Sequence, residues 1–346
     1  MSAWVSGVLL GAYAFTSVGL MVYGLHCYFM IYLFVRRQKV CRAEIKDDVK
    51  RYHVGRELPD YPFVTIQLPI YNEGAVVDRL IRCAVSVDYP ADRLDVQVLD
   101  DSNDATCASV DQTIADLKQE GSLVPVTVFR RTVRKDFKAG ALAAATPCAR
   151  GEYLAMFDAD FIIPHNFLMR TIPLFAGHPK VACVQTRWGH TNRDDNWLTR
   201  AQSVGIDGHF TAEQGARSYN SLCLNFNGSA GIWRKDRIAE AGGWQGDTLT
   251  EDLDLSYRAQ LMGYRIRYDF DTECPAELPG DVNALKSQQR RWAKGSIETA
   301  RKLIPVICRS RQLSVLQKVE AVVHLTSYFV ALLMVILCLL ALPLLW

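Results

Sequence analysis

The feature that most constrains this chain is a charge-free apolar stretch at its start. From Met1 to Val35 there is no Asp, Glu, Lys or Arg, and the stretch exceeds the ~20 residues that a helix needs to cross a bilayer. Basic residues follow this stretch, beginning with Arg36 and Arg37, whereas a signal peptide would begin with positive charge. The segment 1–35 is therefore predicted to be a transmembrane helix with its basic flank in the cytoplasm.

A second uncharged stretch covers residues 321–346 and is also predicted to span a membrane. Since the chain stops there with no polar tail, we expect the natural protein to continue beyond Trp346. The polar region between the two stretches must then lie on one side of the membrane. We expect an integral protein of a plasma, inner or Golgi-type membrane, with a cytoplasmic linker over 36–60 and a cytoplasmic globular domain over 61–289.

The segment 290–320 is basic and carries apolar residues at helical spacing. It is predicted to form one or two amphipathic helices on the membrane face, broken at Pro305. Ordinary packing of these helices against the globular domain is the alternative.

Composition narrows the class of protein. The net charge is only +2, with 22% charged residues, so bulk charge gives no reason to expect a nucleic-acid partner. The ten cysteines form no C-x-x-C pair and the seven histidines no H-E-x-x-H pattern. This favours reduced thiols over disulfides, and it argues against a zinc or histidine metal site.

Buried-strand patterns alternate with helical ones across the polar region. Strands are predicted over 63–70, 94–102, 124–131 and 152–160, with helices after the first strand and over 138–150. Continuous apolar runs separated by helices indicate an α/β fold with a mostly parallel sheet, whose ligands bind at the carboxyl ends of the strands.

Acidic residues close two of these strands, Asp100 and Asp101 the second and Asp158 and Asp160 the fourth. Carboxylates that converge on one edge repel one another unless a cation lies between them. An Asp-x-Asp pair suits Mg²⁺ or Mn²⁺, which complete their shell with water and phosphate oxygens. On its own, such a pair is more often a solvated turn.

Seven short motifs occur in a fixed order: "QLPIYNE", "LDDSND", "KAGAL", "FDADF", "NGSAGIWR", "TLTEDLDLSYRA" and "QQRRW". Together they resemble the membrane-embedded family-2 glycosyltransferases, in particular the cellulose-synthase-like mannan and glucan synthases. The resemblance covers about residues 60 to 300. It implies a GT-A catalytic domain, a nucleotide-sugar donor, Mg²⁺ or Mn²⁺, and inversion at the anomeric carbon.

The resemblance also assigns roles to residues. It implies Asp252 as general base with Glu251 beside it, and Asp158 and Asp160 as metal ligands. The residues implied to bind the nucleotide sugar are Tyr71, Glu73, Asp100, Asp101, Lys138, Asp158, Gln288 and Arg291. Trp292, Gly228 and Trp233 are implied at the acceptor site.

Each role has a plain alternative. Asn72, after Tyr71, could instead cap a turn. Lys138 could be an exposed lysine whose charge is solvated, and Trp292 could anchor the chain at the membrane interface. The acids of the "TED" motif suit the dipole of a helix that Thr250 caps. "NGSAGIWR" suits a tightly packed strand equally well.

The expected function is processive transfer of sugars to a growing β-linked polysaccharide, from UDP-glucose first and GDP-mannose next. One predicted span on each side of the domain is fewer than cellulose synthases have. This leaves open an oligomer, or a non-processive enzyme that transfers one sugar to a lipid such as ceramide or diacylglycerol. A nucleotide sensor without catalysis is disfavoured, because Asp252, the aspartate pair and Arg291 are all present.

Overall fold

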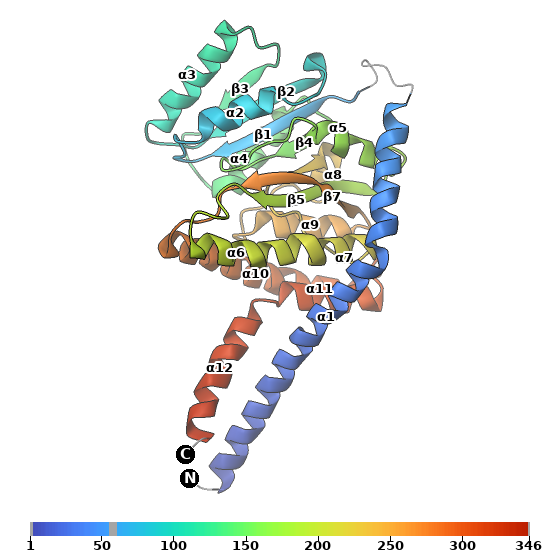
Figure 1. Cartoon of the computed structure of the whole chain (residues 1–346), viewed down its shortest axis with the longest axis vertical. Coiled ribbons are helices and arrows are strands. Elements are labelled where there is room, and N and C mark those ends of the chain that lie inside the picture. The colour runs from blue at the N-terminus through green and yellow to red at the C-terminus, as the bar shows by residue number, and fades with distance from the viewer. Residues whose placement is uncertain (1–2, 55–60, 345–346) are drawn as a thin grey trace.

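A computed structural model describes residues 3–54 and 61–344 of the chain. A globular domain lies beside one long helix, and two helices project together from its lower end (Figure 1). The strands are β1 (Val64–Ile70), β2 (Leu94–Asp100), β3 (Val126–Phe129), β4 (Tyr153–Met156), β5 (Val181–His190), β6 (Gly231–Arg234) and β7 (Arg265–Ala276). They form one sheet in the order β3-β2-β1-β4-β6-β5-β7.

The predicted mostly parallel sheet is confirmed. β1 pairs in parallel with β2 and β4, β2 with β3, and β5 with β7. Every residue of β1 and of β2 is buried, as their continuous apolar runs indicate.

The order of the strands reverses beside β1. The chain moves outward from β1 to β2 and β3 through α2 (Val77–Val85) and α3 (Thr106–Gln119), and then returns through α4 (Phe137–Ala145) to β4 on the other side of β1. Because such crossovers are right-handed, the reversal places α4 on the opposite face of the sheet from α2 and α3. The carboxyl ends of β1 and β4 therefore border the crevice in which sheets of this kind bind ligands.

β6 is the exception, since it runs antiparallel to both β4 and β5. The strand reading of "NGSAGIWR" is thus confirmed for Gly231–Arg234. Antiparallel pairing sets Gly231 opposite Met156, so the residues before β6 lie beside those that follow β4. The backbone N–H of Asp158 donates to Ser229 Oγ over 2.9 Å and fixes this contact.

Most of the remaining helices lie toward the lower end of the domain (Figure 1). The full set is α5 (Phe167–Thr171), α6 (Trp197–Asp207), α7 (Gln214–Tyr219), α8 (Lys235–Glu240), α9 (Glu251–Leu261), α10 (Val282–Arg309), α11 (Val315–Leu325) and α12 (Phe329–Leu344). A π-helical segment, Gly208–Glu213, joins α6 to α7.

The predicted linker over 36–60 is wrong for most of its length. Helix α1 (Ala3–His53) continues through it without a break, and residues 55–60 lie outside the described residues. The second half of α1 docks on the domain: Phe34 stacks on Tyr219, and Asp48 pairs with Arg267 over 2.8 Å. These contacts give the helix a partner and remove the need for a flexible connection.

The prediction that Pro305 breaks the helix is also wrong. It lies inside α10, one turn before the helix ends at Arg309. Packing of segment 290–320 against the domain is confirmed in part, and its contact with a membrane stays a prediction. Leu303, Ile307 and Leu313 are buried in a cluster with α9 and α11, whereas Ile297, Leu316 and Val319 are exposed.

One described helix, α1, is long and apolar enough to cross a membrane. The second predicted span is a bent pair in which α11 and α12 meet at 62°. The boundary expected at residue 321 falls inside α11, and α12 begins at Phe329. α1 and α12 pack together and project from the domain side by side (Figure 1).

Candidate active site

The aspartates of "MFDADF" lie in the turn just beyond β4, which ends at Met156. Both are partly buried. Burial, and then the charge of Asp158, raise the pKa of Asp160 to about 7. Asp158 forms an ion pair with Lys138. The two aspartates therefore have less positive charge near them than their own negative charges would need.

Lys138, in the first turn of α4, brings distant motifs together. Its Nζ contacts Asp158 and donates to the carbonyl oxygen of Gly228 over 2.9 Å. Burial opposes its charge, but Asp158, Glu251 and Asp252 together raise the pKa of Lys138. It is thus not the exposed, solvated lysine of the alternative interpretation.

Glu251 and Asp252 occupy the first turn of α9. A Cβ atom built on Gly228 would lie 2.9 Å from Asp252 Oδ2 and 3.4 Å from Lys138 Nζ. Gly228 has φ +79°, so a side chain there would be strained and would also fill the space between Asp252 and Lys138. Burial, and then Glu251, raise the pKa of Asp252 to about 7.

Thr250 precedes α9, as predicted, but its side chain does not cap the helix. Its hydroxyl lies 3.2 Å from that of Thr299 on α10 instead. Asp254 is fully buried between Arg258 on α9 and Lys302 on α10.

A divalent cation fits the aspartate pair. Among the described residues, no group of three or more His, Cys, Asp or Glu side chains is placed to hold a metal alone. Mg²⁺ and Mn²⁺ need fewer protein ligands when phosphate and water supply the rest. The charge of Asp158 also raises the pKa values of Glu73 and Glu251, in both cases after burial, so a cation here would relieve several carboxylates at once.

The carboxyl ends of β1 and β2 carry Tyr71, Glu73, Asp100 and Asp101. Glu73 Oε2 accepts from the backbone N–H of Tyr71 over 3.3 Å. The side chain of Asn72, with φ 57°, donates to Asn103 Oδ1 and accepts from the backbone N–H of Asn103. It therefore joins the two strand ends and caps no helix, because α2 begins only at Val77.

Arginines from the loop after β3 hold both aspartates at the end of β2. Arg130 Nε donates to Asp100 over 2.8 Å, and Arg131 donates to both carboxylate oxygens of Asp101. Burial works against ionisation of Asp100, but Arg130 and Ser102 lower its pKa. Sequence reasoning missed these arginines, although the run "RRTVRK" directly after a strand is a visible signal.

α10 carries Gln288, Arg291 and Trp292. It packs closely on the start of α9, since a Cβ atom on Gly295 would lie 2.6 Å from Thr250 Cγ2. Gln288, Trp292 and Gly295 repeat at helical spacing, which sets them on one face. Gln288 Oε1 is buried with no hydrogen-bond partner, and Arg291 is exposed with no ion pair within the described part of the chain.

The placement of Trp233 at the acceptor site is wrong. It is fully buried in β6, where its ring packs edge-on against Phe226 and Trp244. Trp188, on β5, is better placed, since its Nε1 lies 3.3 Å from the carbonyl of Ser229, next to Gly228. Successive residues of a strand point to opposite faces of the sheet, and this alternation, which the motif does not show, decides which tryptophan faces the core.

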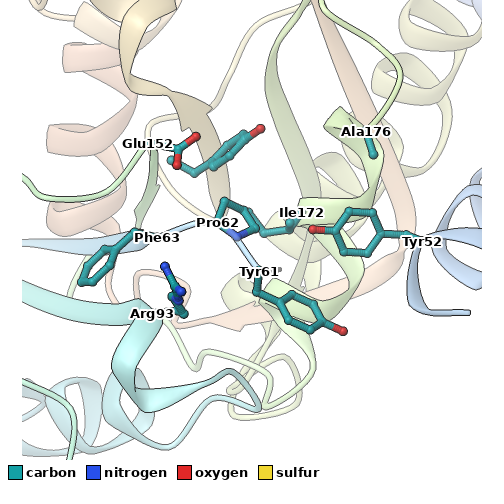
Figure 2. Close-up of a pocket in the computed structure, with 9 residues that line it drawn as sticks. Tyr52, Tyr61, Pro62, Phe63, Arg93, Glu152, Ile172 and Ala176 are labelled. Atoms are coloured by element: carbon teal, nitrogen blue, oxygen red, sulfur yellow. The ribbon is translucent and has the colours of Figure 1, made fainter. Parts of the chain in front are cut away.

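A cavity of about 410 Å³ lies elsewhere, near the amino ends of β1 and β4. Figure 2 shows Arg93, Glu152 and tyrosine rings around it. It is at the opposite edge of the sheet from Asp158, and it has no part in the site.

Three comparisons bear on this geometry. Residues 60–295 match the model of the family described as "Glycosyltransferase like family 2". The chain is 41% identical over 263 residues to the probable glucomannan 4-beta-mannosyltransferase 7 of Oryza sativa subsp. japonica, which covers 75% of this chain and 45% of the relative. It is 38% identical over 262 residues to glucomannan 4-beta-mannosyltransferase 7 of Arabidopsis thaliana, over 75% of this chain and 47% of that one. The chain thus spans about half the length of these relatives.

Solved structures share the fold. A mannosyltransferase from Pyrobaculum calidifontis, in complex with GDP-Man and Mn²⁺, has a TM-score of 0.57 at 21% identity, over 88% of this chain and 85% of its own. S. aureus TarS 1–349 with UDP-GlcNAc has a TM-score of 0.56 at 14% identity, over 78% of this chain and 73% of that chain. The predicted GT-A architecture is confirmed, and the chain belongs to glycosyltransferase family 2, among relatives of the cellulose-synthase-like type.

Proposed function

We propose that this chain transfers mannosyl units from GDP-mannose to the hydroxyl of a β-linked mannan or glucomannan, with inversion at the anomeric carbon. One observation carries the proposal: Lys138, Asp158, Gly228 and Asp252, from four separate motifs, meet at a single point. That point joins a general base to a site for a diphosphate.

The donor differs from the first choice that the sequence favours. Expectation put UDP-glucose before GDP-mannose, but the relatives reported above are named mannosyltransferases, and none of those names supports UDP-glucose. We therefore propose GDP-mannose as donor.

The chain's own groups supply the proton transfer. Asp252 accepts the proton of the acceptor hydroxyl while its oxygen forms the bond to the anomeric carbon. The bond from that carbon to the phosphate oxygen breaks, and GDP leaves. Asp252 is left protonated, and the single displacement inverts the centre.

Positive charge is needed where the diphosphate leaves. Lys138 supplies one charge, and Arg291 is free to bind phosphate oxygens in two-point fashion. Asp158 and Asp160 would hold Mn²⁺ or Mg²⁺, which offsets the charge of the leaving group. Trp292 and Gly228 are the proposed acceptor contacts.

We also propose that the protein is integral to a membrane, with the domain on the cytoplasmic side. α1 supports this, since its apolar part is followed by Arg36, Arg37 and Lys39. We further propose that synthesis is processive. Transfer of a single sugar to a lipid would contradict this part of the proposal.

The test is donor turnover. The reconstituted chain is supplied with Mn²⁺ and either GDP-mannose or UDP-glucose, and release of GDP or UDP is followed together with product size. We expect GDP release, a product longer than a glycolipid, and loss of turnover on chelation that added Mn²⁺ restores. Faster turnover of UDP-glucose would contradict the donor, and a single-sugar lipid would contradict processivity.

A further inference from the structure

Arg134 covers the exposed ring of Tyr71. Its Cζ atom lies 3.3 Å from the ring centroid of Tyr71 and 5.1 Å from that of Phe137. Tyr71 follows β1 at the crevice where the strand order reverses, and Arg134 belongs to the loop between β3 and α4. An arginine thus covers the aromatic face of Tyr71 at the end of β1.

The donor must lie across this edge in a fixed order. Its sugar belongs beside Asp252 and Gly228, which lie on the β6 side of β4, and its diphosphate beside Lys138 and Asp158. β1 and β2 lie on the other side of β4. A donor that extends from Asp252 past Asp158 therefore brings its base over Tyr71, where Arg134 now rests. This step rests on the proposed function, because it takes a nucleotide sugar as the donor.

Arg134 is held more loosely than its neighbours. Arg130 and Arg131 each make several hydrogen bonds to carboxylates and carbonyls. Arg134 Nε is buried without a hydrogen-bond partner and is 3.9 Å from Asp101 Oδ2. Within the described residues, stacking, a long ion pair with Asp101 and the charge of Glu73 keep it in place, and it makes no hydrogen bond that a ligand would have to displace.

We propose that Arg134 selects the base of the donor. In the free protein it covers Tyr71. When the donor binds, Arg134 leaves the ring to the base and donates two hydrogen bonds to an edge with two adjacent acceptors. Guanine presents such an edge, O6 and N7, which arginine binds in bidentate fashion. Uracil has no two adjacent acceptors on one edge, so it gains at most one of these bonds.

Nucleotide binding tests this without turnover. Affinities for GDP, UDP and 7-deaza-GDP are measured by calorimetry in the presence of Mn²⁺, for the wild type, Arg134→Ala, Arg134→Lys and the control Lys135→Ala. Lys135 is the exposed neighbour, with no side-chain bond within the described residues. 7-Deaza-GDP lacks the N7 acceptor and keeps the rest of guanine.

We expect the wild type to bind GDP more tightly than UDP and than 7-deaza-GDP. Arg134→Ala should weaken GDP about 10-fold or more, leave UDP unchanged or tighter because the ring is uncovered, and remove the difference between GDP and 7-deaza-GDP. Arg134→Lys should lose most of the preference, since an ammonium group cannot reproduce the two-point contact. Lys135→Ala should match the wild type.

Two results overturn the inference in different ways. If the wild type prefers GDP and Arg134→Ala keeps the same ratios, Arg134 does not select the base, and the proposed donor stands. If the wild type prefers UDP and turns over UDP-glucose, the proposed donor falls together with the inference.

Discussion

At the scale of single residues, the catalytic proposal depends on the ionisation of Asp252. Its pKa is raised to about 7, first by burial and then by Glu251, with Lys138 acting in the opposite direction. A general base must be ionised to accept a proton. Turnover should therefore rise with pH through about 7 and fall roughly tenfold per pH unit below it.

Asp252→Asn should lower kcat by about 10²–10⁴-fold with little change in donor affinity. A separate readout avoids reliance on activity. A carboxyl with a raised pKa binds more protons in the folded than in the unfolded state, so its contribution to the free energy of unfolding decreases as pH rises from about 4 to 7. The thermal stability of the variant relative to the wild type should thus increase across that window. Retained turnover, or a flat stability difference, would contradict the assignment.

Part of the candidate site could be predicted from residue types and their positions in the sequence, and the rest depends on contacts that only the structure shows. Asp158, Asp160 and Asp252 follow buried strands or open a helix, and such positions are visible in the sequence. The meeting of Lys138 with the carbonyl of Gly228, 90 positions later, depends on the antiparallel turn of β6. Trp233 was placed wrongly, because the sequence does not distinguish a tryptophan in a hydrophobic core from one in a sugar-binding site.

At the scale of elements, α10 is held to α9 by a cluster of charged groups around the buried Asp254. Lys302 Nζ is 2.9 Å from Asp254 Oδ1, 2.8 Å from Asp247 Oδ1 and 2.7 Å from Gln245 Oε1. Glu298 accepts from the backbone N–H of Leu249 over 3.0 Å. These bonds place the helix of Gln288 and Trp292 against the segment that leads to Asp252.

Lys302→Ala should lower the free energy of unfolding by about 1–3 kcal/mol, because it leaves the fully buried Asp254 with one cation fewer. It should also lower kcat, as α10 loses its register on α9. Lys294→Ala is the matched control on the same helix: its Nζ lies 3.7 Å from Glu298 and its side chain is 63% exposed. That variant should stay within about 0.5 kcal/mol of the wild type, and equal effects of the two changes would refute the role of Lys302.

Helix boundaries were less predictable than helix existence. Pro305 removes one backbone donor, which leaves the carbonyl of Arg301 without its helical partner. That carbonyl is not among the last four of α10, so Pro305 costs the helix one interior backbone hydrogen bond. Packing of Leu303 and Ile307 into the cluster with Tyr257 keeps the helix intact, and a propensity argument does not include that packing.

At the scale of the whole molecule, the second half of α1 packs as part of the globular domain. Phe34 is buried against Tyr219 and Phe270, with ring centroids 6.3 and 6.1 Å apart, respectively. Phe34→Ala should cost about 3–5 kcal/mol, read as a lower midpoint of thermal unfolding in detergent. Phe15→Ala, at a position 77% exposed, should leave the midpoint unchanged. If both variants unfold alike, α1 does not contribute to the stability of the domain.

Sequence composition alone located the change from an apolar to a charged stretch of α1, which begins at Arg36. It could not show that the charged half of α1 stays helical, because this depends on partners such as Arg267 and Asp271 that lie more than 200 positions away. Local sequence patterns indicate a strand or a helix, but contacts with residues distant in the sequence decide whether a polar stretch is a flexible linker or a rigid helix.

The unbroken α1 fixes the distance between its apolar part and Asp252. Its 51 residues form a rod about 75 Å long, with no break between the apolar part and the part that packs on the domain. If the apolar part spans a bilayer, as proposed, the length of this helix sets how far Asp252 lies from the lipid surface. Seven residues inserted between the apolar part and Phe34 would then move the site by about 10 Å with almost no rotation.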